Sequence, residues 1–205
     1  MSNNTQSTYR RFHPLVADAY TQVDNWIQQN VQKAKGYKSI DPRGKWKEIL
    51  QKEDWKHTAF QYYYLFPSHY FKAAYVLENV IGQDKLEVWL RHKQRMCVLD
   101  IGCGAGAGSA AFLESILQMQ EMEKLTDVVD ILFIGVDPNL KAMGFYIQMM
   151  SKLKSSISSI TDYIKIDFKF VHYGFPKAIG DINKHLKDEI LQCHLERKTN
   201  YYSVT

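Results

Sequence analysis

The sequence predicts an α/β fold in which a doubly wound parallel sheet follows a small helical region. Short apolar runs recur in the second half of the 205-residue chain, and segments with a helical spacing of apolar residues separate them. Because parallel strands need a crossover connection, this alternation indicates right-handed strand–helix–strand units. We therefore expect a flexible tail over residues 1–12, a helical region over 13–95 and a sheet domain over 96–205.

The helical region is predicted from apolar residues that recur every three or four positions between Pro14 and Arg95. Gly36 follows the first helical pattern as a stop signal, and "DPRG" at 41–44 is typical of a turn. Pro67 with Ser68 predicts the start of a new helix, since proline suits the first helical position. The dense aromatic residues around Pro67 are interpreted as packing rather than as a cofactor site.

Three segments predict strands: "MCVLDI" at 96–101, "VVDILFIGVD" at 128–137 and "YIKIDFKFVHYGF" at 163–175. The first two are apolar almost throughout, as expected for strands that are buried on both faces. The third alternates, and its charged residues suit a strand at the edge of the sheet. "SSISSITD" at 155–162 is interpreted as the loop before it.

Composition predicts a globular protein without a membrane span. The chain is 45% hydrophobic and 13% aromatic, and no apolar run approaches the roughly 20 residues that cross a bilayer. The amino terminus lacks the apolar core of a secretion signal, so we expect a cytoplasmic location. A short organellar import segment is the alternative for its Ser/Thr/Asn-rich start. The three cysteines form no CxxC pair, so we expect neither a disulfide framework nor a metal site.

The net charge of +4 has its basic excess in residues 31–57. Eight Lys and Arg residues face four acids there, and Tyr37, Trp46 and Trp55 interleave with them. Cations with interleaved aromatic rings can meet phosphates and stack on bases, which makes RNA a candidate partner. The charge count alone favours the alternative, a solvated helical face whose aromatic rings point into the core.

The stretch "VLDIGCGAGAGSAAF", from Val98 to Phe112, predicts a ligand-binding loop after the first strand. Glycines at 102, 104 and 106 permit a tight turn and let a ligand approach the backbone, and the helix that follows presents free N–H groups. The loop also satisfies the dinucleotide pattern G-x-G-x-x-G/A, but Asp100 would oppose a pyrophosphate. Its carboxylate suits a cationic ammonium or sulfonium group, which favours S-adenosylmethionine over NAD.

The end of the second strand, "FIGVDPN", predicts a contact to a nucleoside. Asp137 lies where an acid can accept hydrogen bonds from ribose hydroxyls, beside the glycine loop. Asn139 either caps the helix that follows or touches the ligand. The alternative role of Asp137 is that of the helix cap, with Pro138 at the first helical position, and this role is compatible with ribose binding.

"VLDIGCGAG" resembles motif I of the class I S-adenosylmethionine-dependent methyltransferases, and "ILFIGVDPN" is similar to their next motif. The resemblance covers roughly residues 97–174 and implies a Rossmann-like cofactor-binding domain with S-adenosylmethionine as cofactor. It also implies that His172 or Tyr173, at the end of the third strand, lies near the adenine. The candidate cofactor-binding residues are Asp100, Gly102, Cys103, Gly104, Gly106, Asp137, Pro138 and Asn139.

The segment "YYYLFPSHYFKAAYVLENVI" before motif I is similar to the helical lead-in of the ribosomal small-subunit methyltransferase-like family. This likeness implies RNA or a ribonucleoprotein as the partner. The later cysteine cluster of that family has no counterpart in this chain, so we expect no metal-cluster role.

We expect the carboxyl-terminal part of the methyltransferase fold to be missing. Such a sheet has seven strands, whereas the third strand here is followed by one amphipathic helix, with Ile182, Leu186, Ile190 and Leu191, and by "NYYSVT", which can begin a fourth. The catalytic motif usually follows that fourth strand, so no residue is nominated as the catalytic group. Because half a sheet exposes apolar surface, the chain is either a fragment or completed by another polypeptide.

Three functions are compatible with these features. The leading one is a class I methyltransferase, or its cofactor-binding part, that acts on RNA or a ribonucleoprotein. The second is a catalytically inactive methyltransferase-like subunit that serves as an assembly or interaction module. The third, a nicotinamide-dependent oxidoreductase, predicts that Asp100 is dispensable for dinucleotide binding.

Overall fold

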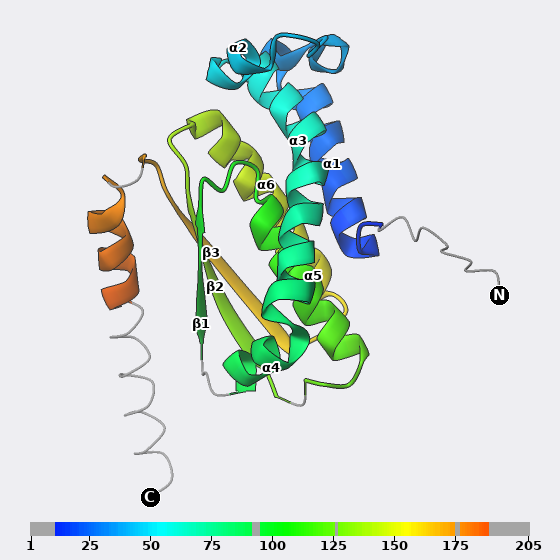
Figure 1. Ribbon diagram of the computed structural model, residues 1–205, viewed down its shortest axis with the longest axis vertical. Coiled ribbons are helices and arrows are strands. Elements are labelled where there is room, and N and C mark those ends of the chain that lie inside the picture. Colours follow the sequence, from blue (N-terminus) through cyan, green and yellow to red (C-terminus); the bar gives the residue numbers. More distant parts are fainter. Residues whose placement is uncertain (1–10, 92–94, 126, 175–176, 189–205) are drawn as a thin grey trace, which may run out of the picture.

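The computed structural model describes residues 11–91, 95–125, 127–174 and 177–188, which form an α/β fold around a three-stranded parallel sheet (Figure 1). The strands lie in the order β1 (Met96–Ile101), β2 (Val129–Val136) and β3 (Ile164–Val171). Helix α5 (Ala107–Glu121) connects β1 to β2, and α6 (Leu140–Ser158) connects β2 to β3. The predicted alternation of strand and helix is therefore confirmed.

The described residues before the sheet are helical. Their elements are α1 (Pro14–Asn30), η1 (Gln32–Ala34), η2 (Tyr37–Ser39), α2 (Trp46–Gln51), α3 (Trp55–Val76), η3 (Leu77–Ile81) and α4 (Gln83–Arg91). Helix α3 packs against α5 and α1 packs against α6, so the helical region forms a second layer over the helices of the sheet (Figure 1). Buried residues of all four helices belong to one hydrophobic core.

Helix α3 runs continuously through Pro67, where the sequence predicted the start of a new helix. Proline has no N–H, so the carbonyl oxygen of Tyr63, four residues earlier, lacks its usual helical donor. The hydroxyl of Tyr20, on α1, donates a hydrogen bond to this oxygen at 2.8 Å. The predicted helix boundary was wrong because a side chain of the neighbouring helix replaces the missing bond.

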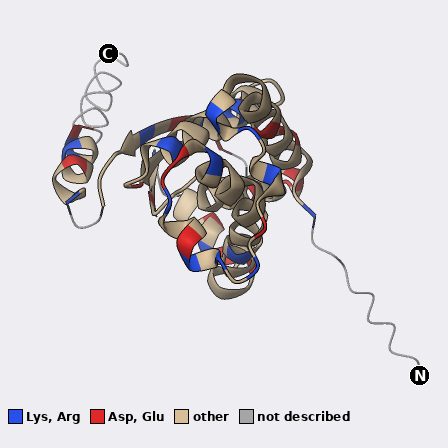
Figure 2. Ribbon diagram, turned by 90° about the horizontal axis from the view of Figure 1, so that it is seen from above, with Lys and Arg blue, Asp and Glu red and all other residues tan. Residues whose placement is uncertain are grey.

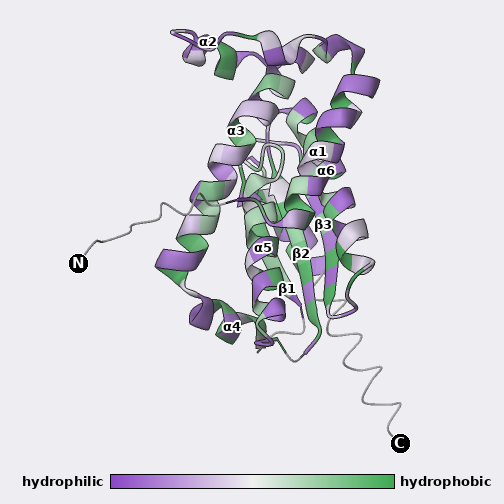
Figure 3. Ribbon diagram, turned by 90° about the vertical axis from the view of Figure 1, so that its right-hand side faces the viewer, coloured by the Kyte–Doolittle hydropathy of each residue, from purple (hydrophilic) through white to green (hydrophobic). Residues whose placement is uncertain are grey.

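The two faces of the sheet are covered by different elements. Helices α5 and α6 pack on the face that carries Ile131 and Phe133, both fully buried. A helix over 179–188 packs on the opposite face, where Ile182 contacts the cluster around Leu132 and Ile134. Figure 3 shows hydrophobic residues along the strands and mainly hydrophilic residues at the α2 end of the molecule.

Strand β3 forms one edge of the described sheet, as predicted. Asp167 on this strand pairs with the ammonium of Lys154 at 2.7 Å and with the guanidinium of Arg95. The two cations come from α6 and from the residue just before β1. Charged side chains of this kind make an edge strand a poor template for pairing with another chain.

Strand β1 forms the other edge of the described sheet, whereas the sequence predicted a strand buried on both faces. Leu99 and Ile101 are 44% and 50% exposed. They lie beside Ile134 and Val136 in the register of β1 with β2. The helix over 179–188 covers that face on β2 and β3, and no described element covers it on β1.

Two further boundaries differ from expectation. The interpretation of 155–162 as a loop was wrong over 155–158, because α6 continues to Ser158 and Ile157 extends its buried apolar stripe. Phe12, expected in the flexible tail, packs instead between the rings of Tyr20 and Phe71. The rest of the predicted tail, residues 1–10, lies outside the described residues, as do Ile190, Leu191 and the segment 200–205. No described helix is both long and apolar enough to span a membrane.

Candidate functional site

The glycine loop, residues 102–106, crosses the carboxyl end of β2. The N–H groups of Gly102 and Cys103 both donate to the carbonyl oxygen of Val136, at 2.7 and 3.1 Å. The N–H of Gly106 donates back to Cys103 at 2.7 Å and closes the turn. The loop after β1 and the end of β2 are therefore held together by backbone hydrogen bonds.

Gly102 and Gly104 are the glycines of this loop that face open space. Both adopt left-handed conformations, with φ of +71° and +51°, which non-glycine residues rarely adopt. A Cβ atom on either residue would have no other atom within 4 Å. Packing therefore does not explain why these positions are glycine, whereas their left-handed backbone conformation does.

Gly106 and Gly135 are instead required by packing against Tyr146. A Cβ on Gly135 would lie 2.8 Å from the ring of Tyr146, and one on Gly106 would lie 3.0 Å from the same ring. Tyr146, on α6, is fully buried beneath the loop. Gly106 thus leaves room for the Tyr146 ring beneath the turn. Gly135 has the same role, and the sequence did not single it out.

Asp100 caps helix α5. Its Oδ2 accepts hydrogen bonds from the N–H of Ser109 at 3.0 Å and from the Ser109 hydroxyl at 2.7 Å. The N-cap position itself is Gly106, which has no side chain to cap with, so the strand residue supplies the acceptor. Burial raises the pKa of Asp100, and the nearby charge of Asp137 adds to the increase.

Asp137 braces the loop from the end of β2. Its Oδ2 accepts from the N–H of Gly104 at 2.9 Å, and its Oδ1 accepts from the N–H of Asn139 at 2.8 Å. The side chain is nearly buried, yet it lines a cavity beside the loop. Each carboxylate oxygen has a second lone pair, so Asp137 can also accept from a ligand hydroxyl.

Asn139, rather than Asp137, caps helix α6. Its Oδ1 accepts from the N–H groups of Lys141 and Ala142, and its amide donates to the hydroxyl of Thr58 on α3 at 3.2 Å. Pro138 precedes the cap, and its carbonyl oxygen accepts from the ring Nε2 of His172 at 2.9 Å. Pro138 and Asn139 therefore hold the neighbouring segments in place.

Cys103 lies in the loop between the two carboxylates. Its thiol is buried, and a Cβ on Gly135 would lie 3.0 Å from its sulfur. Burial raises the pKa of this thiol, and the charges of Asp100 and Asp137 add to the increase. Because the reactive form of cysteine is the thiolate, Cys103 is a packing residue rather than a nucleophile.

The backbone N–H groups of the loop are largely used within the chain. Five of them donate to the carbonyl or carboxylate acceptors described above: Gly102, Cys103, Gly104, Gly106 and Ser109. The sequence predicted free N–H groups at the start of α5, and that expectation was wrong for Gly106 and Ser109, the two of these residues that belong to the helix start.

A cavity of about 230 Å³ lies between the glycine loop and α3. One wall consists of Gly102, Cys103, Gly104 and Asp137. The facing wall comes from the helical region and includes Leu50, Thr58, Gln61, Phe66 and His69. The sequence missed these α3 residues, although Thr58, Gln61, Leu65 and His69 follow helical spacing on one face.

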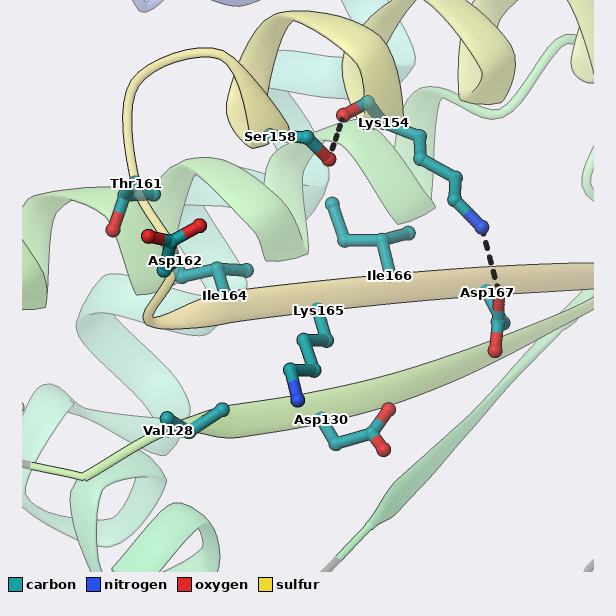
Figure 4. Close-up of a pocket in the computed structure, with 10 residues that line it drawn as sticks. All are labelled: Val128, Asp130, Lys154, Ser158, Thr161, Asp162, Ile164, Lys165, Ile166 and Asp167. Atoms are coloured by element: carbon teal, nitrogen blue, oxygen red, sulfur yellow. Dashed lines mark hydrogen bonds and ion pairs between the residues drawn. The ribbon is translucent and has the colours of Figure 1, made fainter.

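A larger cavity, of about 640 Å³, lies beside β3 and away from the glycine loop (Figure 4). Both signs of charge line it, including Asp130, Lys154, Lys165 and Asp167. Lys154 pairs with Asp167 in this cavity, while Ile166 points toward α6. The cavity contains none of the predicted site residues, and three aspartates and two lysines line it.

The aromatic residues of the basic segment pack inward. Tyr37 is buried, Trp46 contacts the ring of Tyr64 and Trp55 contacts the ring of Phe145. The favoured interpretation, that the aromatic rings of this segment point into the core, is therefore confirmed, and the alternative of free ring faces for bases was wrong for these three residues. In Figure 2, which views the molecule from the α2 end, basic and acidic residues are interspersed.

The chain has no match among the family models, the curated proteins or the solved structures with which it was compared. Among the described residues, no group of three or more His, Cys, Asp or Glu side chains could hold a metal ion.

Proposed function

We propose that this chain binds S-adenosylmethionine at the glycine loop and is a class I methyltransferase, or its cofactor-binding part, that acts on RNA or a ribonucleoprotein. The observation that carries the proposal is the opening at Gly102 and Gly104. These residues face free space directly beside Asp137, at the carboxyl ends of parallel strands. Ligands of open α/β sheets bind at this kind of position.

The charges around the loop fit a cationic nucleoside cofactor. The buried carboxylates of Asp100 and Asp137 interact unfavourably with each other, which contributes to the raised pKa of Asp100. A sulfonium or ammonium group nearby would relieve this repulsion, whereas a pyrophosphate would add to it. The free lone pairs of Asp137 match ribose hydroxyls. These features favour S-adenosylmethionine over NAD.

The size of the cavity limits how much of the cofactor it encloses. Pockets for ligands of this size usually measure about 300–1,000 Å³, and the cavity of about 230 Å³ is smaller. It therefore holds one part of the cofactor, and the remainder extends along the carboxyl ends of β2 and β3. His172 and Tyr173 follow β3 at that end, in line with the adenine contact implied by the resemblance.

Methyl transfer requires the chain mainly to position the reacting groups. When bound, S-adenosylmethionine supplies a methyl group that its sulfonium has already activated for transfer. The glycine loop and Asp137 would orient that group, and the apolar residues of α3 would exclude water. The group that receives the methyl would then lie on the α3 side of the cavity, opposite the glycine loop.

Exposed lysines of the helical region support RNA as the acceptor. Lys33, Lys35, Lys45 and Lys47 are exposed and form no ion pair with the described residues. Leu50, on α2, lines the cavity, so the lysines at the start of this helix lie near its mouth. Such a surface contributes phosphate contacts without base readout.

Titration calorimetry with S-adenosylmethionine, S-adenosylhomocysteine and NAD tests the proposal. We expect saturable binding of the first two ligands. Gly104→Ala should weaken it at least about tenfold, because the methyl group enters the ligand space, and Asp137→Asn should weaken it by a similar factor. Gly82→Ala is the matched control, since Gly82 has a left-handed φ of +80° like Gly104 and the added methyl group lies in open space outside the loop. A folded chain that binds neither ligand, or binds NAD more tightly, would refute the proposal.

A second function, that of an inactive interaction module, is favoured by the exposed apolar residues of β1. Leu99 and Ile101 form an uncovered apolar strip on a sheet face, and such surfaces mark interaction sites. Transfer of labelled methyl groups to total RNA or to small ribosomal subunits separates the two functions. Cofactor binding without transfer would support the module.

A further inference from the structure

Helix α3 places polar side chains opposite the glycine loop, across the cavity. Thr58, Gln61 and His69 line this wall, and Leu65 and Phe66 lie among them. The sequence interpreted this part of the chain as packing, which describes the buried Phe66 but not its polar neighbours. The cavity therefore has a polar side that neither the glycine motif nor Asp137 accounts for.

Two of these polar groups already have partners. The hydroxyl of Thr58 accepts from the amide of Asn139 at 3.2 Å, and the amide nitrogen of Gln61 donates to the carbonyl of Ile49 at 2.9 Å. Tyr62, which also lines the cavity, donates its hydroxyl to the carbonyl of Tyr20 at 2.9 Å. His69, in contrast, makes no hydrogen bond with any described residue.

The protonation of the groups that face the cavity also distinguishes His69. His69 remains partly exposed, but its partial burial lowers its pKa, and the charge of Lys72, one turn along α3, lowers it further. Its imidazole is therefore neutral at pH 7 and can accept a proton. Burial raises the pKa values of Cys103 and Tyr62, so both stay protonated, and Asp137 is engaged by two backbone donors.

We propose that His69 takes up the proton of the RNA group that is methylated. This group is an N–H or O–H group, and it enters the cavity between α3 and the glycine loop. This inference rests on the proposed function. The imidazole of His69 takes the proton of this N–H or O–H group while the lone pair of the nitrogen or oxygen forms the bond to the methyl carbon. The electron pair of the S–CH3 bond stays on sulfur, so the positive charge moves from the sulfonium to the imidazolium. The acceptor is thus a nitrogen or oxygen that loses its proton directly to a base, not a carbon atom that first needs a cysteine nucleophile.

The first test compares His69→Asn with His57→Asn. His57 lies on the same helix outside the cavity, where its ring pairs with Asp54 at 2.7 Å. We expect both variants to bind S-adenosylhomocysteine within about threefold of the wild type. Transfer of labelled methyl groups to total RNA should fall by about 10²–10⁴ in His69→Asn only. In the wild type, the rate should rise with pH through the lowered pKa of His69 and then level off.

A second test does not depend on turnover. Proton NMR of the imidazole resonances, assigned with the two variants, follows His69 and His57 as S-adenosylhomocysteine is added. The proposal predicts that the His69 resonance shifts and the His57 resonance does not. Saturating binding with an unmoved His69 resonance would overturn it, and so would binding without any methyl transfer by the wild type, or full activity in His69→Asn. Failure of S-adenosylhomocysteine to bind would instead overturn the proposed function itself.

Discussion

At the scale of single residues, the glycines near the loop serve two different purposes. Gly102 and Gly104 leave space into which a ligand can come, whereas Gly106 and Gly135 make room for the ring of Tyr146. The sequence pattern treats the first three alike, since they occupy alternate positions of one motif. Substitutions at the two kinds of position should therefore affect different properties, ligand binding or stability.

Gly135→Ala should destabilise the fold. The added methyl group would lie 2.8 Å from the ring of Tyr146 and 3.0 Å from the sulfur of Cys103. Overpacking of this kind costs about 1–3 kcal/mol of unfolding free energy. Chemical denaturation measures the loss, and Gly180→Ala, which meets no atom within 4 Å, is the control. An unchanged free energy of unfolding in Gly135→Ala would show that the loop and Tyr146 adapt at no cost.

The two carboxylates show how far residue identity predicts a role. Asp100 and Asp137 were both predicted to lie at the loop, and the structure brings them there, one at the end of β1 and one after β2. The same carboxylates also satisfy backbone N–H groups, of Ser109 and Gly104 respectively. A short acidic residue beside a helix start suits capping and ligand binding equally well, so sequence alone could not separate the roles.

At the scale of elements, local signals predicted most helices and strands but failed where another element intervened. Pro67 is a strong local signal for a helix start, yet α3 continues through it. The reason is the hydroxyl of Tyr20, 43 residues before Tyr63, which donates a hydrogen bond to the carbonyl of Tyr63. No window of sequence around Pro67 contains this partner.

The pairing of Tyr20 with the Pro67 position can be measured by a double-mutant cycle. Tyr20→Phe should lower the free energy of unfolding by about 0.5–1.5 kcal/mol, because the Tyr63 carbonyl loses its donor. In a Pro67→Ala background the same change should cost less, since the new N–H of residue 67 can bond to that carbonyl. Equal costs in both backgrounds would contradict the explanation, and chemical denaturation of the four proteins decides.

At the scale of the whole molecule, the helical region and the sheet share one hydrophobic core. A buried hydrogen bond of 2.6 Å from the hydroxyl of Tyr70, on α3, to the carboxylate of Glu114, on α5, adds a polar link between them. The wall opposite the glycine loop is therefore held by the same contacts that stabilise the fold. We expect the described parts to unfold together in a single transition.

Tyr70→Phe tests this cooperativity. Loss of the buried hydroxyl should lower the free energy of unfolding by about 1–3 kcal/mol. Far-UV circular dichroism, which reports helices, and tryptophan fluorescence should shift together in denaturant. Tyr75→Phe, at an exposed position of the same helix, is the control and should change little. Separate transitions in the two signals would show that the helical region unfolds on its own.

Local patterns in the sequence predict the α/β fold, the position of β3 at an edge and the location of the glycine loop and Asp137 at one end of the sheet. These features depend on periodicity and on turn residues, which act over a few neighbouring positions. Contacts between distant elements set the course of α3 through Pro67 and the exposure of β1, whereas the sequence already favoured the inward packing of the basic segment's aromatic rings. Such contacts also set which residues face the glycine loop, because His69 and Gly104 line one cavity only when α3 packs over the sheet's helices, and no local pattern encodes the proximity of residues 35 positions apart.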